Sequence, residues 1–328
     1  MDDLRIVFFD EIDDPYKVTL LFHTSLSFAA MPSLLKEIRD NDDRYTPEFG
    51  IFAVTRSGTV AAGHLLMKIA TETIDGRLEI AGVNAVGTRP DFSRRGIMTS
   101  IMKASHRYFL ECGLRFGALT SSRRLGATIM YNGLGYVEVA HDILVAKYPN
   151  QPRTPAPSEI VVRGFMEDDV ADIDNVYKKS VKGSYGFIHR PSNFLKARKF
   201  GPSGEIKPGE NLRIAQKGNS RELTGYAYWE SNPHSSECYE IMAVNAASFH
   251  ALLADAELRN PEAGIVIWCN GLTDLEMRWL QEANYQTPLD GYGSLLMKDL
   301  KGKTDLKELK RMYGVESGRF RIGLWDGT

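Results

Sequence analysis

A turn rich in arginine and glycine is the part of this 328-residue chain best suited to chemistry. The apolar run Leu78–Val86 is typical of a strand, and Ile97 opens a segment whose apolar residues recur at helical spacing. The residues between them read GTRPDFSRRG and place Arg94 and Arg95 directly before Gly96. The unpaired N–H groups at the start of such a helix, together with the helix dipole, attract an anion. A pyrophosphate fits such a turn well. A surface turn with two solvated arginines fits these residues equally well.

A second segment with chemical potential follows a short predicted strand, Leu114–Thr120. It reads AxxxYxxxGY, with Ala127 and Tyr131 one helical turn apart on the same face. Gly135 is suited to end that helix. A tyrosine in such a place is most commonly a partly buried helix residue. Because both segments occur together, the pattern favours a functional tyrosine.

The two segments resemble the signatures of the GNAT acetyltransferases. The turn is similar to the acetyl-CoA pyrophosphate loop of that family, with Ser93 where Arg or Gln is usual and Met98 where Gly or Ala is usual. The arginine doublet before Gly96 is similar to the loop of the enhanced-intracellular-survival type of aminoglycoside acetyltransferase. The second segment resembles the family's AxxxYxxxGF stretch, in which the tyrosine lies near the thioester sulfur.

The resemblance implies that acetyl-CoA is the cofactor, and it implies which residues hold it. The pantetheine arm is expected along the backbone of Val86, Gly87 and Thr88, whose N–H groups could also stabilise an oxyanion. Tyr131 is the expected general acid that protonates the leaving thiolate. The pyrophosphate is expected on the turn and the first helical residues: Ser93, Arg94, Arg95, Gly96, Ile97, Met98 and Thr99.

Ser121 is the second predicted catalytic residue, because it follows a strand whose end should line the cleft of an α/β fold. It could contact substrate or hold a water, and a helix N-cap is the structural alternative. The general base stays open. Glu79 and His64 are candidates, although an exposed strand residue is the simpler interpretation of each.

The resemblance implies direct attack of a primary amine on the thioester in a ternary complex, with a small molecule or a peptide as acceptor. Two alternatives stay open: a non-catalytic tandem module that binds acyl-CoA or a partner, and an aminoacyl or long-chain acyl transferase. Phe22, Phe28 and Met31 lie on the segment that borders the acceptor site in GNAT folds, but they could equally belong to the core. The acceptor itself is not identified.

Composition restricts the class of molecule. Apolar residues make up 43% and charged residues 25% of the chain, and the net charge is -2, which is typical of a globular protein. This balance gives no basis for nucleic-acid or membrane binding. An acidic N-terminus without a long apolar run predicts a cytoplasmic protein. Three dispersed cysteines predict neither a disulfide framework nor a metal site, and a homo-oligomer is allowed.

The expected fold class is α/β with a mixed sheet, built as two tandem GNAT-like acyl-CoA N-acyltransferase domains. Residues 1–148 are expected to be the catalytic, cofactor-binding domain, in the order strand, helix, hairpin, strand, phosphate turn, helix, strand, helix, strand. Residues 149–158 form a proline-rich linker, which cannot lie inside regular structure.

The second half repeats this outline without the chemistry, and residues 159–300 are expected to be a degenerate GNAT-like domain. After a predicted strand Tyr239–Ala246, the segment Ala247–His250 replaces the basic glycine loop, and Leu280 stands near the place of the tyrosine. Residues 301–328 form a tail with a charged helix, Thr304–Tyr313, and an apolar ending, Phe320–Trp325.

Overall fold

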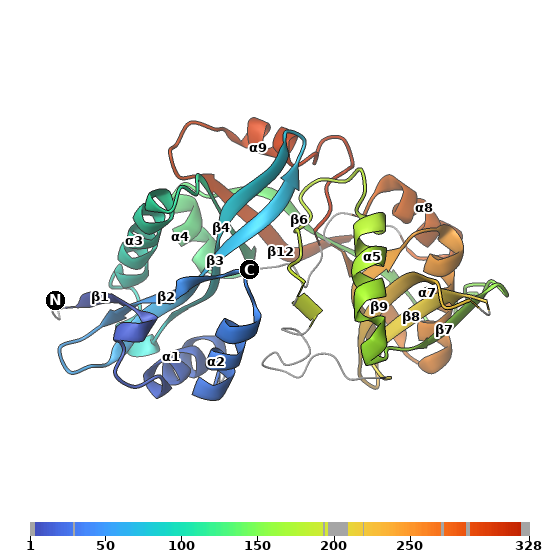
Figure 1. Cartoon of the computed structure of the whole chain (residues 1–328), viewed down its shortest axis with the longest axis horizontal. Coiled ribbons are helices and arrows are strands. Elements are labelled where there is room, and N and C mark those ends of the chain that lie inside the picture. Colours follow the sequence, from blue (N-terminus) through green and yellow to red (C-terminus); the bar gives the residue numbers. More distant parts are fainter. Residues whose placement is uncertain are drawn as a thin grey trace.

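A single mixed sheet runs through both halves of the chain. The computed structural model describes residues 4–28, 30–192, 194–195, 209–218, 220–269, 272–286 and 289–322. Among these residues the strands are ordered β1-β2-β3-β4-β5-β12-β6-β11-β10-β9-β8-β7. Each strand of the first half has a counterpart in the second half at the same distance from the centre of this order. The predicted fold class and the predicted repeat are therefore confirmed (Figure 1).

The first half forms its elements close to the predicted places. Its first five strands are β1 (Arg5–Phe8), β2 (Tyr45–Val54), β3 (Val60–Thr73), β4 (Gly76–Thr88) and β5 (Phe116–Ser122). Its helices are α1 (Tyr16–Leu26), α2 (Pro32–Asn41), α3 (Ile97–Glu111) and α4 (Ala127–Gly133).

These helices cover two faces of the sheet. Successive side chains of a strand point to opposite faces. Leu65 accordingly packs with Phe22 of α1, whereas its neighbour Leu66 packs with Ile101 of α3. The hydrophobic pattern thereby places α1 and α2 on one face, and α3 and α4 on the other.

The second half has the same order of elements. Its strands are β7 (Ile160–Gly164), β8 (Leu212–Lys217), β9 (Leu223–Ser231), β10 (Ser235–Ala243) and β11 (Gly264–Cys269). Its helices are α5 (Val170–Ser180), α7 (Ala246–Arg259) and α8 (Asp274–Glu282).

One junction of the second half differs from the prediction. The strand expected over Tyr239–Ala246 ends at Ala243, and Ala247–His250, which stands in place of the basic glycine loop, lies inside α7. The reason is local, because the Asn245 side chain accepts a hydrogen bond from the Ser248 N–H at 2.9 Å and caps the helix immediately after the strand.

The two halves exchange their last strands. β12 (Leu289–Asp299) lies between β5 and β6 (Val137–Lys147), where Ser294 is opposite Ser121 on one side and His141 on the other. In return β6 pairs with β11 of the second half. The sheet therefore does not break at the proline-rich linker, and the final strand of residues 159–300 pairs with strands of the first half.

The C-terminal tail also packs on the first half. It forms α9 (Leu306–Met312), which lies within the charged helix predicted over Thr304–Tyr313. Tyr313 and Phe320 are buried against Ile69 of β3. Of the predicted apolar ending, residues 323–325 lie outside the described residues.

Candidate functional site

The sheet opens between β4 and β5. These parallel strands pair only at Ala81–Gly117 and Gly82–Ala118. Farther along β4, Ala85 has a φ of 54°, and the pairing with β3 shifts by one residue, as at a β-bulge. The backbone of Val86–Thr88 therefore lies at an opening of the sheet, where a ligand can pair with it as a further strand would.

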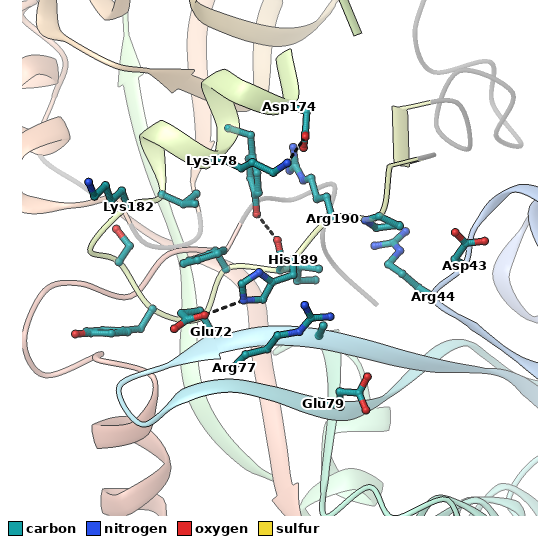
Figure 2. Close-up of a pocket in the computed structure, with 18 of the residues that line it drawn as sticks. Asp43, Arg44, Glu72, Arg77, Glu79, Asp174, Lys178, Lys182, His189 and Arg190 are labelled. Atoms are coloured by element: carbon teal, nitrogen blue, oxygen red, sulfur yellow. Dashed lines mark hydrogen bonds and ion pairs between the residues drawn. The ribbon is translucent and has the colours of Figure 1, made fainter. Parts of the chain in front are cut away.

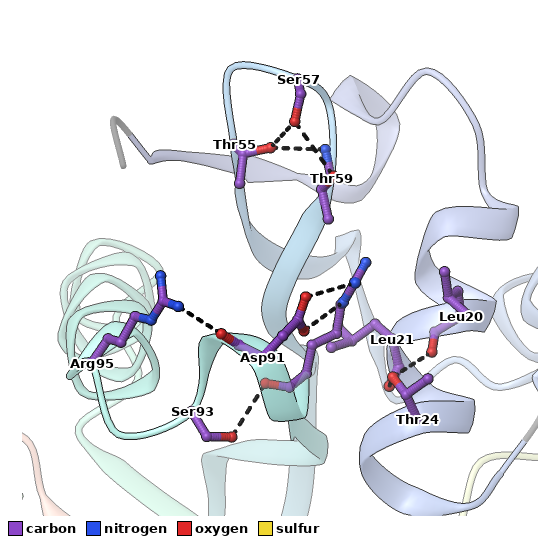
Figure 3. A network of polar contacts seen from close by, with 10 residues as sticks. Leu20, Leu21, Thr24, Thr55, Ser57, Thr59, Asp91, Ser93 and Arg95 are labelled. Carbon is purple, nitrogen blue, oxygen red and sulfur yellow. Dashed lines mark hydrogen bonds and ion pairs between the residues drawn. The ribbon is translucent and has the colours of Figure 1, made fainter. Parts of the chain in front are cut away.

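The turn after β4 is held in shape by two arginines. The Arg89 guanidinium forms an ion pair with Asp91 at 2.9 Å, and Arg95 Nη2 donates to the Asp91 carbonyl oxygen at 2.7 Å (Figure 3). Both guanidinium groups lie over the Phe92 ring, 5.6 and 5.2 Å from its centroid. Ser93 Oγ donates to the Arg89 carbonyl oxygen at 3.2 Å. These contacts fix the backbone of the turn before any ligand binds.

Arg94 and Gly96 differ from their neighbours. Both residues adopt a left-handed backbone, with φ of 60° and 74°, which glycine accepts without strain. The Arg94 side chain is exposed and has no polar partner among the described residues. A Cβ added to Gly96 would meet no atom within 4 Å. The approach to the turn is open, and Arg94 is the arginine available to a ligand there.

The first turn of α3 lacks a side-chain cap. Gly96 is its N-cap residue and supplies no capping oxygen, so the first N–H groups of this 15-residue helix point toward the turn together with its positive dipole end. The side chains of Ile97 and Met98 are buried in the core, so Met98 does not fill the turn. The corresponding helix α7 is capped by Asn245. Only α3 of the two presents an uncapped N-terminus to an anion.

Tyr131 packs against the two strands that separate at this opening. It belongs to the same buried cluster as Val83 of β4, Leu119 of β5 and Met98 of α3. Burial raises the pKa of Tyr131 to about 12, so the phenol is protonated at neutral pH. Among the described residues its hydroxyl has no hydrogen-bond partner, whereas the hydroxyl of neighbouring Tyr136 is 3.1 Å from His106 Nε2.

Ser121 lies within β5 and does not cap a helix, because α4 begins later, after Gly126. By strand alternation it shares the face of Leu119, which packs with Tyr131. Its cross-strand neighbour Ser294 donates to Glu138 Oε2 at 2.5 Å. Serines from the two halves therefore lie opposite each other on neighbouring strands, and a substrate contact by Ser121 stays a prediction.

Neither candidate base lies at the opening. His64 is fully buried, and its Nε2 is 2.8 Å from Ser105 Oγ of α3, so its interpretation as an exposed strand residue was wrong. Burial lowers its pKa to about 4. Glu79 is half-exposed near the start of β4 and forms an ion pair with Lys68 at 2.9 Å. No general base is therefore identified among the described residues.

The apolar residues of the acceptor segment divide into two groups. Phe22 is fully buried in the core, whereas Phe28 and Met31 are 36% and 43% exposed. The end of α1 lies against β4, because a Cβ on Gly87 would clash with Ser25 Oγ. Phe28 and Met31 are therefore the two that stay available to a ligand.

Among the described residues, no three His, Cys, Asp or Glu side chains are grouped so that they could bind a metal ion. Nor is any helix in this part of the chain long and apolar enough to cross a membrane.

Comparison with known proteins agrees with this geometry. Residues 18–138 match the family model of the acetyltransferase (GNAT) domain. No curated protein matches the sequence. A GCN5-related N-acetyltransferase from Kribbella flavida has a similar structure, with 17% identity and a TM-score of 0.68 over 90% of this chain and 71% of that one.

Two further solved structures extend the likeness. A probable N-acyltransferase from Enterococcus faecalis V583 shares 13% identity with a TM-score of 0.71, over 94% of this chain and 75% of that one. Eis1 from Mycobacterium abscessus shares 13% identity with a TM-score of 0.61, over 90% and 74%. At these identities the likeness shows the fold.

Proposed function

We propose that this chain is a transferase that moves an acetyl group from acetyl-CoA to a primary amine, because residues 18–138 match the family model of the acetyltransferase (GNAT) domain. The uncapped first turn of α3, beside the β4–β5 opening, carries this proposal. It combines free N–H groups, a positive dipole end and an unpartnered Arg94, which is the chemistry that binds a pyrophosphate.

The residues of the turn and of β4 are suited to hold the cofactor. Arg94 and the backbone of Gly96–Thr99 would hold the pyrophosphate, while Ser93 and Arg95 keep the turn in shape through their contacts with backbone carbonyls. The backbone of Val86–Thr88 would hold the pantetheine arm at the opening. Acetyl-CoA supplies the activated acetyl thioester.

Tyr131 is the proposed general acid. A leaving thiolate needs a proton, and Tyr131 carries a protonated hydroxyl without a competing partner among the described residues. A pKa of about 12 makes full proton transfer to a thiolate of ordinary pKa, about 8.5, unfavourable. The hydroxyl therefore acts by donating a hydrogen bond to the sulfur, which stabilises the negative charge that accumulates as the C–S bond breaks. The proton that the attacking amine loses balances the thiolate.

We also propose that the two halves have different roles. Residues 1–148 supply the cofactor site, and residues 159–300 are a degenerate domain whose α7 is capped and whose Leu280 is buried in the core. β12 nevertheless brings Ser294 beside Ser121. The second half thus contributes to the wall along which a small-molecule or peptide amine would approach.

Acetyl-CoA binding tests the proposal directly. At about a hundred times its Kd, a ligand stabilises the native state by roughly 2.7 kcal/mol, so acetyl-CoA should raise the thermal unfolding midpoint of the wild type clearly. Arg94→Ala should lose most of this shift, because it removes the unpartnered charge. Differential scanning fluorimetry measures both.

Arg95→Ala is the matched control. This arginine is engaged with Asp91 and Phe92, so its removal should lower the midpoint without ligand more than it lowers the shift. An equal shift in the wild type and Arg94→Ala would show that acetyl-CoA does not use this turn.

A further inference from the structure

A large cleft lies between the two halves, away from the proposed acetyl-CoA site. Its volume is about 880 Å³, within the range of small-molecule sites. One wall is the β3–β4 hairpin, from Lys68 to Glu79, and the other is α5 with residues 181–191 (Figure 2). Glu79 stands near the start of β4 and Thr88 at its end, which separates the cleft from the turn by about 30 Å at the rise of an extended strand.

The walls of the cleft are held together by backbone hydrogen bonds. The Glu72 N–H donates to the Phe187 carbonyl oxygen at 3.0 Å, and the His189 N–H donates to the Ala70 carbonyl oxygen at 2.8 Å. Within the second wall, the Tyr177 hydroxyl of α5 donates to the Ile188 carbonyl oxygen at 2.9 Å. The cleft is therefore preformed, and a ligand does not have to order its walls.

Part of the lining is aromatic and apolar. The Phe187 ring lies edge-on to Tyr177, with centroids 6.4 Å apart, and 5.2 Å from the His189 ring. Val181 and Ile188 line the same cleft and are buried. Such a surface suits a flat or apolar ligand body.

Several charged side chains line the cleft, and two of its cations are not ion-paired among the described residues. Two of its carboxylates form ion pairs inside the cleft, Glu79 with Lys68 at 2.9 Å and Asp174 with Lys178 at 2.5 Å. Glu72 is hydrogen-bonded to His189 Nε2 at 2.8 Å. Arg77 and Lys182 are exposed cations with no ionic partner among the described residues, against one such carboxylate, Asp43.

We propose that this cleft binds a small organic anion, a carboxylate or a phosphate monoester with an aromatic or apolar body, whose oxyanion lies on Arg77. Figure 2 shows the Arg77 side chain directed from the hairpin into the cleft. A guanidinium offers two parallel N–H groups to a carboxylate or phosphate, and the half-buried Phe187 ring, which packs on Tyr177, receives the body. This site is separate from acetyl transfer, because it uses neither the α3 turn nor Tyr131.

Isothermal titration calorimetry with benzoate, phenyl phosphate and neutral benzamide tests the site on the full chain. At least one anion should bind the wild type at least ten times more tightly than benzamide, and the tighter of the two identifies the oxyanion as carboxylate or phosphate. Arg77→Gln should weaken that anion at least tenfold. Its unfolding midpoint without ligand should equal that of the wild type, because Arg77 forms no ion pair with any residue that the structure describes.

Two controls keep the assignment specific. Asp43→Asn removes the unpaired carboxylate of the same cleft and should bind the anion as tightly as the wild type or more tightly. Arg94→Ala should leave the affinity unchanged. The proposal is overturned if neither anion binds at about 10 mM, ten times a Kd of 1 mM. It is also overturned if Arg77→Gln binds the anion as tightly as the wild type does, or if Arg94→Ala is the variant that loses binding.

Discussion

Tyr131 carries the proposed chemistry because its hydroxyl has no hydrogen-bond partner in the described part of the chain. Its ring is packed edge-on against Tyr136, with centroids 6.1 Å apart, yet only the Tyr136 hydroxyl is paired, with His106. Two buried tyrosines of similar environment thus differ in whether the hydroxyl is already hydrogen-bonded or is available to donate to a ligand. This difference provides a matched pair for mutagenesis.

Tyr131→Phe should lower kcat at least a hundredfold, since general acid catalysis contributes about 10²–10⁴-fold, and should leave the acetyl-CoA-dependent thermal shift unchanged. Tyr136→Phe should lower stability and affect kcat much less. Release of the CoA thiol with an amine drawn from polyamines, amino acids and aminoglycosides measures the rate. Equal kcat values for the wild type and Tyr131→Phe would remove Tyr131 from the mechanism.

Two buried histidines make stability depend on pH. Burial lowers the pKa of both His64 and His106 to about 4, whereas an unfolded histidine titrates near about 6.5. Between these values the unfolded chain binds more protons than the native one, so stability is complete above pH 6.5 and falls as the pH drops toward 4. Each histidine contributes at most about 3 kcal/mol to this loss.

Urea unfolding at pH 7.0, 5.5 and 4.5 should show this decline in the free energy of unfolding. His106→Phe should reduce the slope against pH by about one proton, whatever its stability at pH 7.0. A free energy that stays constant between pH 7.0 and 4.5 would contradict the assignment.

At the scale of elements, the contrast between α3 and α7 explains why only one half is expected to bind acetyl-CoA. Both helices follow the strand at the same place in their half. α3 starts after a turn with two left-handed residues and no cap, whereas α7 starts at once with the Asn245 cap. In α7 the donor that would meet a phosphate is already satisfied by its own chain.

The contact between α1 and β4 can be tested in the same way. A methyl group on Gly87 would clash with Ser25 Oγ, which itself donates to the Leu21 carbonyl oxygen. Gly87→Ala should therefore destabilise the protein by roughly 1–3 kcal/mol. In a double-mutant cycle with Ser25→Gly, urea unfolding should give a favourable coupling of about 1 kcal/mol. Additive effects would mean that the two elements do not press together here.

At the scale of the whole molecule, the exchanged strands make each half depend on the other. β12 closes the gap between β5 and β6, and Met297 of β12 with Tyr313 and Phe320 covers apolar residues of β3 and β5 such as Ile69 and Phe116. A chain cut at the linker loses both contributions. The linker is also fastened, because Thr154 Oγ1 donates to the buried Glu257 carboxylate at 2.6 Å.

Residues 1–148 expressed alone should therefore not unfold cooperatively, because β5 and β6 would lack the strand between them and the apolar face would be exposed. Co-expression with residues 149–328 should restore a complex that melts as one unit. Circular dichroism melting and a ¹H–¹⁵N NMR spectrum report the outcome. A dispersed spectrum from residues 1–148 alone would show that the exchange is dispensable.

The sequence determined the features that depend on neighbouring residues. The positions of β4 and α3, the helix of Tyr131, the turn at Gly96 and the outline of the second half follow from periodicity, dipole and glycine, which act within a few residues. It also carried a cap signal that the prediction missed, since Asn245 before Ala246 is a favourable helix start.

Only the tertiary structure decided the rest, because the pairing of strands and the burial of side chains depend on residues far apart in the chain. It placed β12 between β5 and β6, although nothing in the local sequence names the partner of a strand. It divided the arginine doublet into a structural Arg95 and an unpartnered Arg94. It also buried His64 under α3 and placed Arg77 in a cleft between the halves, where each acquires its environment from elements that its own segment does not specify.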